Sequence, residues 1–137
     1  MMRNALRILA VLILGLTIGS PESYAKKKSD GEARIKLEES TFNFGIIDEK
    51  GGPVSHEFEF INTGTGNLVI YDVRTQCGCT RPEYPKNPIA PGKKGKIKIT
   101  FLPQGRVGSL NKAATIYTNG KPSKTEVRIK GSVVPKK

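Results

Sequence analysis

The residues of this chain best suited to chemistry are two cysteines and one histidine. Cys77 and Cys79 are the only cysteines, with Gly78 between them, and His56 is the only histidine. Two thiols this close can share a metal ion, close a small disulfide or remain reduced in a core. Each state implies a different function, and the residues alone leave all three open.

A metal site is one alternative. Two thiolates and an imidazole form a soft ligand set that suits Cu(I) or Zn(II). Structural zinc takes four ligands, so a carboxylate such as Glu83 or a water would have to complete it. Cu(I) accepts two or three ligands and fits Cys77, Cys79 and His56 better. The competing interpretation of His56 is a histidine at the margin of the core, on the strand face that carries Phe58.

A disulfide between Cys77 and Cys79 is the second alternative. Residues two apart in an extended strand lie near the upper limit of disulfide Cα spacing, and Gly78 permits a tighter bend. A bond over one intervening residue should be strained, and strained disulfides are labile and oxidising. Such a short loop contributes little stability. An oxidised Cys77–Cys79 pair would therefore indicate thiol-redox exchange more than structural stabilisation.

The segments that position these residues alternate as β-strands do. In residues 54–61, His56, Phe58 and Phe60 share one face while glutamates occupy the other. This pattern is typical of a half-buried strand. Further strands are expected at 41–46, 68–73, 96–102, 113–118 and 126–134, with turns at 51–53, 62–67 and 119–120 and a proline-rich loop after residue 80. Short strands without helical periodicity after residue 25 predict an all-β sandwich of about seven strands.

The strand faces predict a single core. Its expected members are Phe58, Phe60, Leu68, Ile70, Ile97, Ile99, Phe101, Ile116, Val127 and Ile129. The turn at 62–67 reverses the chain, so the start of strand 54–61 and the end of strand 68–73 should lie at one pole. If the two strands sit in opposite sheets, their ends stand about 10 Å apart. We expect His56 to share that pole with the cysteines without touching them.

The N-terminus predicts export. Arg3 precedes an apolar run at 6–18, and Ser23 and Ala25 place small residues at a cleavage site. This is the three-part pattern of a helical signal peptide. The run is shorter than the about 20 residues of a bilayer span, so we expect no stable membrane span after cleavage. The expected organisation is a signal peptide at 1–25, a flexible lead-in at 26–34, a sandwich domain at 35–134 and a basic tail at 135–137.

The charge balance indicates the kind of partner. The net charge is +11, and removal of Arg3, Arg7 and Glu22 with the signal peptide lowers it to +10. A basic exported protein is attracted to anionic envelope polymers, although a solvated lysine surface explains the same composition. No nucleic-acid partner is expected, because the chain has no arginine-rich helix and few tyrosines to stack on bases.

No enzyme motif is apparent. The sequence has no recognisable Ser-His-Asp context and no phosphate-binding glycine loop. Any catalysis would have to be thiol chemistry at Cys77 and Cys79. We therefore expect a non-enzymatic protein.

An ordered set of motifs carries a family resemblance. The set is Phe42-Asn43-Phe44-Gly45-x-Ile47, His56-x-Phe58-x-Phe60-x-Asn62-x-Gly64, Leu68-x-Ile70-x-x-Val73, Cys77-Gly78-Cys79-Thr80, Ile89-x-Pro91-Gly92 and Ile129-x-Gly131. Over residues 35–134 it resembles the bacterial exported family called domain of unknown function 1573. That family is similar to the immunoglobulin-like sandwich of the major sperm protein and Hydin (ASH) group.

The resemblance implies an exported, immunoglobulin-like sandwich that is periplasmic or extracellular and whose activity is not established. The corresponding function is a binding or envelope-associated module, whose partner would be an envelope protein or an anionic envelope polymer. The alternative is a protein that binds Cu(I) or Zn, or performs thiol-redox chemistry, at Cys77 and Cys79. Fold likeness alone does not choose between them.

Overall fold

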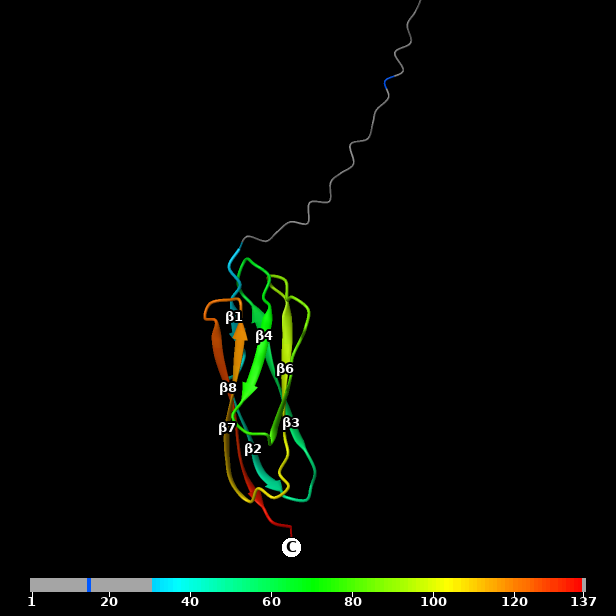
Figure 1. Ribbon diagram of the computed structural model, residues 1–137, viewed down its shortest axis with the longest axis vertical. Helices are drawn as coiled ribbons and strands as arrows, with labels where there is room; N and C mark the ends of the chain where they lie inside the picture. Colours follow the sequence, from blue (N-terminus) through cyan, green and yellow to red (C-terminus); the bar gives the residue numbers. More distant parts are fainter. Residues whose placement is uncertain (1–14, 16–30, 137) are drawn as a thin grey trace, which may run out of the picture.

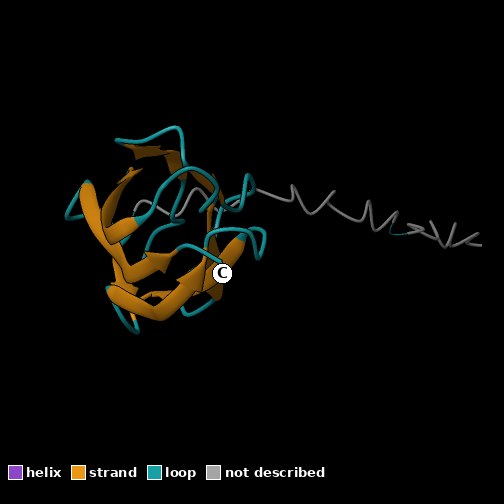
Figure 2. Cartoon of the chain, turned by 90° about the horizontal axis from the view of Figure 1, so that it is seen from below, coloured by secondary structure: helices purple, strands orange, loops and turns teal. Residues whose placement is uncertain are grey.

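The protein is a sandwich of two four-stranded sheets. The computed structural model describes residue 15 and residues 31–136. Apart from position 15, the signal peptide expected at 1–25 lies outside the described residues, as does the lead-in before residue 31. Figures 1 and 2 show the sheets packed face to face around the core, with strands and loops but no helix among the described residues.

The first five strands along the chain alternate between the two sheets. One sheet has the order β1 (Ile35–Leu37), β3 (Val54–Asn62), β6 (Lys94–Phe101) and β5 (Thr80–Glu83); the other has β2 (Thr41–Asp48), β8 (Lys124–Val134), β7 (Gly108–Thr118) and β4 (Ile70–Thr75). After this alternation, β5 pairs with β6 and β7 pairs with β8. Neighbouring strands are antiparallel except β2 and β8, which are parallel. The structure thus confirms the predicted all-β sandwich.

The predicted core is confirmed as well. In the register of β3 and β6, Phe58 lies opposite Ile97 and His56 lies opposite Ile99. All ten core residues expected from the alternation are buried, with exposed fractions of 6% or less. Side chains of both sheets therefore fill one apolar layer, which accounts for most of the favourable free energy of folding.

Two strands and one boundary differ from the prediction. β1 is too short to show a period, and Pro82 makes the sequence of β5 look like a loop. A proline is tolerated there because β5 ends its sheet. The lead-in expected to continue to residue 34 joins the fold earlier: Ala33 is 3% exposed, and its carbonyl accepts a hydrogen bond from the Lys121 amide.

Two short crossovers close the sides of the sandwich. The edge strands β1 and β2 are joined by residues 38–40, and the edge strands β4 and β5 by residues 76–79. We call the first the histidine edge, because residues 38–40 lie beside His56 and Phe42, and the second the disulfide edge, because it contains Cys77 and Cys79. β3 and β4 lie in opposite sheets, so the strand that holds His56 does not pair with the strand that leads to the cysteines.

Candidate functional site at the disulfide edge

Cys77 and Cys79 are joined in a disulfide, with their Cα atoms 5.1 Å apart. Hydrogen bonds hold the backbone on both sides of the bond. The Cys77 carbonyl accepts from the amide and the hydroxyl of Thr80 at 3.2 and 3.0 Å, and from the Thr75 hydroxyl at 3.3 Å. The Cys79 carbonyl accepts from the Leu102 amide at 2.8 Å. The two sulfurs therefore sit on a backbone anchored to β4, β5 and the end of β6.

The two cysteines differ in their exposure. Cys79 is 1% exposed and belongs to the core, whereas Cys77 is partly exposed and packs against the core from outside. Gly78 is exposed at the tip, and a Cβ atom there would meet nothing within 4 Å. The Cys79 amide donates a hydrogen bond to Cys77 Sγ at 3.2 Å. Cys77 is thus the more exposed of the two cysteines, and Cys79 lies inside.

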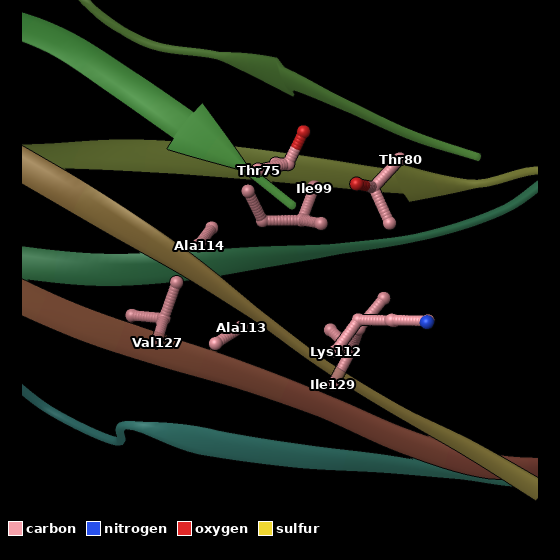
Figure 3. Close-up of a pocket in the computed structure, with 8 residues that line it drawn as sticks. All are labelled: Thr75, Thr80, Ile99, Lys112, Ala113, Ala114, Val127 and Ile129. Atoms are coloured by element: carbon pink, nitrogen blue, oxygen red, sulfur yellow. The ribbon is translucent and has the colours of Figure 1, made fainter. Parts of the chain in front are cut away.

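The space beneath the disulfide edge is a packing gap between the sheets. Figure 3 shows Thr75 and Thr80 on one side of it and Ala114 and Val127 on the other. It has no room for a water molecule. The two threonines therefore serve the backbone of Cys77, and the gap is not a ligand site.

An open groove of about 530 Å³ lies at the end of the sandwich beside the disulfide edge. We call it the end groove. Loops from three parts of the chain line it, with Glu49, Lys50, Gly52 and Pro53 after β2, Gly78 and Cys79 before β5, and Leu102, Pro103, Gln104 and Arg106 after β6. In Figure 1 the loops after β2 and β6 lie at the lower end of the molecule, near the C-terminus.

The lining of the end groove combines apolar and cationic groups. Leu102 lies in the same wall as Arg106, and the exposed Pro53 and Lys50 come from the loop after β2. Glu49 Oε1 accepts a hydrogen bond from the Gly105 amide at 3.2 Å, which ties two of the loops together. Pockets that bind ligands typically join apolar walls to a few polar groups. Sequence reasoning missed these loop residues, because their only local signal was a turn at 51–53 and the loops are far apart in the chain.

His56 lies at the histidine edge. Its ring stacks on Phe42 of the opposite sheet with centroids 3.6 Å apart, and meets Phe58 edge-on at 4.9 Å. Its Nε2 atom pairs with Glu39 Oε1 of the crossover. The side chain is 20% exposed. These contacts place His56 at the margin of the core, where it links the two sheets.

The structure does not bring His56 to the cysteines. Ile99 of β6 pairs with His56 on one side and with Pro82 of β5 on the other, so two strand spacings, about 10 Å, separate His56 from β5. The start of β3 does share one end of the sandwich with Cys79, since Pro53 and Cys79 both line the end groove.

The three-ligand metal site is therefore not assembled. Within the described part of the chain, no group of three or more His, Cys, Asp or Glu side chains is arranged to hold a metal ion. A disulfide also offers no thiolate, the form in which cysteine binds metal. The residues as arranged do not fit Cu(I) or Zn, and metal binding by the reduced thiols stays a prediction.

The lysines of β6 lie beside carboxylates. Lys94 pairs with Glu38 at 3.6 Å, and Lys98 with Glu83 at 4.0 Å. Lys96 lies between two glutamates of β3, at 3.3 and 3.8 Å. The outer face of this sheet is thus a mixed-charge surface, and exposed pairs of this kind contribute little to stability.

Residues 35–133 match the model of a family described as Protein of unknown function (DUF1573). The chain belongs to the DUF1573 family. This confirms the family named from the sequence motifs. No curated protein matches the chain. Within the described residues, no helix has the length and apolarity needed to cross a membrane.

Solved structures similar to this DUF1573 protein include a protein of unknown function from Porphyromonas gingivalis W83, with 19% identity and a TM-score of 0.66 over 74% of this chain and 47% of that one. The Vibrio cholerae VesB protease matches with 13% identity and a TM-score of 0.57 over 74% and 32% of the two chains. The secreted serine protease VesC from Vibrio cholerae matches with 9% identity and a TM-score of 0.52 over 74% and 23%. At these identities the likeness shows the fold alone. The chain spans less than half the length of each of these proteins.

Proposed function

We propose that this DUF1573 protein is an exported, non-enzymatic binding module that holds a segment of another envelope protein in its end groove. The observation that carries the proposal is the lining of the groove, where the apolar Leu102 and Pro53 stand with the cationic Arg106 and Lys50. Such a surface suits a polypeptide segment that carries an apolar side chain beside an acidic one. Binding and catalytic residues are commonly found on loops positioned by a rigid sandwich.

A protein partner accounts for more of the structure than an anionic polymer does. A polymer would need a broad basic surface, and on the outer face of the β1-β3-β6-β5 sheet the lysines of β6 lie within 4.0 Å of glutamates instead. A groove of about 530 Å³ is also within the usual range for a binding pocket, about 300–1,000 Å³. The polymer hypothesis remains the competing proposal.

Site-specific photocrosslinking in intact cells tests the proposal. A photoreactive residue at Gln104 should yield one defined, protease-sensitive adduct. The same residue at Ser123, exposed in the loop between β7 and β8, serves as the control position and should not yield it. Arg106→Glu should abolish the Gln104 adduct, because it puts an anion where an acidic segment must sit. Lys93→Glu, the matched charge reversal outside the groove, should preserve it.

Three outcomes would contradict a protein partner. The Gln104 adduct could resist protease, match the adduct at Ser123 or survive Arg106→Glu unchanged. Salt separates the polymer hypothesis further, because exposed charges act over about 8 Å at physiological ionic strength and about 3 Å at 1 M. Adhesion to isolated envelope that disappears at high salt, together with a protease-resistant adduct, would favour the polymer.

A further inference from the structure

We propose that the Cys77–Cys79 disulfide exchanges with thiols of the protein held in the end groove, and that Cys77 Sγ is the sulfur the incoming thiolate attacks. The inference rests on the proposed function for the place where the partner docks. Its chemistry rests on the disulfide edge itself. Gly78 and Cys79 line the end groove and Cys77 is bonded to Cys79 next to it, so a docked segment lies at the loop that carries the bond.

The choice of Cys77 follows from access. Thiol–disulfide exchange requires a thiolate to reach one sulfur while the other leaves. Cys79 is 1% exposed, whereas Cys77 is partly exposed and the neighbouring Gly78 leaves open space. Attack at Cys79 would need the crossover to open, which would break the hydrogen bonds to the carbonyls of Cys77 and Cys79.

The first step forms a bond between the partner sulfur and Cys77 Sγ and breaks the bond between Cys77 and Cys79. The electron pair leaves on Cys79, which becomes a thiolate, and local opening of the crossover lets it take up the proton that the partner thiol lost on ionising. The partner is then held covalently on Cys77.

The second step releases the partner. Its second thiolate attacks the partner sulfur of the mixed disulfide, and Cys77 leaves as a thiolate. The Cys79 amide, which already donates to Cys77 Sγ at 3.2 Å, stabilises that anion. In sum, a partner dithiol becomes a disulfide, and its two electrons and two protons pass to Cys77 and Cys79. The class of partner is therefore an envelope protein with a cysteine pair.

Two single-thiol variants test which sulfur reacts. Cys79→Ser leaves Cys77 free, and Cys77→Ser leaves Cys79 free. With oxidised glutathione as the probe and intact mass as the readout, Cys79→Ser should form the mixed disulfide at least about tenfold faster, because a buried thiol reacts only when the chain opens locally. In strong denaturant the two rates should converge. Equal rates in the folded variants, or faster reaction of Cys77→Ser, would overturn the proposal.

The unaltered protein provides a test that does not depend on the folding of a variant. Brief exposure of the full chain to reduced glutathione, followed by acid quenching and peptide fragmentation, should locate the glutathione on Cys77. A dithiol peptide should then be oxidised in proportion to the reduction of the protein. Glutathione on Cys79, or no exchange, would overturn the inference. Loss of the Gln104 crosslink with intact exchange would refute only the proposed groove partner.

Discussion

Each side of this sandwich has a short crossover between the two sheets, and different interactions hold the two crossovers in place. At the histidine edge, residues 38–40 connect the sheets, and His56 seals the side by stacking on Phe42 and pairing with Glu39. At the disulfide edge, residues 76–79 connect the sheets, and a covalent bond closes the turn.

The difference lies in what each edge leaves accessible. The aromatic contacts bury most of His56, so that edge has a structural role. The disulfide edge adjoins the end groove and leaves Cys77 partly exposed. A disulfide that closes a loop over one intervening residue also constrains the unfolded chain weakly. The disulfide edge should therefore stabilise the fold less than a longer-range disulfide would, while it keeps a cysteine partly exposed beside the end groove.

The largest expected effect comes from the core that both edges cover. Phe60→Ala removes a side chain that is fully buried and should lower the free energy of unfolding by about 3–5 kcal/mol. A urea titration of the variant against the unaltered protein measures it. A negligible loss would mean that the inner face of β3 does not pack in the core that the two edges share.

The disulfide should contribute less than the core residue. Reduction of the bond should lower the free energy of unfolding by less than about 2 kcal/mol, because the closed loop has one intervening residue. Urea titrations with and without a dithiol reductant give the difference. The double variant Cys77→Ala/Cys79→Ala is the control and should not respond to reductant. If reduction lowered the free energy of unfolding as much as Phe60→Ala does, the disulfide would have a mainly structural role.

The histidine edge should depend on the ring stack with Phe42 more than on the contact of His56 with Glu39. His56→Ala should lower the free energy of unfolding. The loss should exceed the contribution of the buried apolar area by about 0.5–1.5 kcal/mol, the usual value of an aromatic pair. His56→Phe keeps a ring against Phe42 and should lose less. Denaturant titrations of both variants separate the contribution of the ring stack from that of the contact with Glu39. Equal losses would assign the edge to the pair with Glu39 and not to the stack.

The smallest expected effect concerns the exposed ion pair on β4, the strand that leads into the disulfide edge. Arg74 donates to Asp72 at 2.8 Å, and this bond is the main reason that the pKa of the Asp72 carboxyl lies below its ordinary value. A lowered pKa gives stability that is present above the unfolded value and lost as pH falls through the folded value. Because both side chains of this pair are exposed, Arg74→Gln should lower the free energy of unfolding by less than His56→Ala does near neutral pH.

The cost of Arg74→Gln should also shrink as the solution is acidified. Thermal unfolding at neutral and acidic pH measures this change. A cost that stays constant as Asp72 becomes protonated would show that Arg74 acts through packing on Tyr117, over whose ring it lies at 5.1 Å.

Local patterns in the sequence were enough to predict the inner faces of β3 and β6. Their side chains alternate with a period of two, and burial of one face follows from that period alone. The same reasoning put His56 on the face of Phe58, which the structure bears out. Local patterns do not predict strand β5, because Pro82 disfavours a strand unless the strand lies at the edge of a sheet.

What the sequence by itself determined is the set of residues able to react and the strands that carry the core, since residue type and short-range spacing are local properties. The tertiary structure decided that β3 and β4 belong to opposite sheets and that β6 separates His56 from the strand after Cys79. It also brought the loops after β2 and β6 to the disulfide. These are long-range relations, set when burial of both apolar faces selects one pairing of the strands, and no local period encodes them.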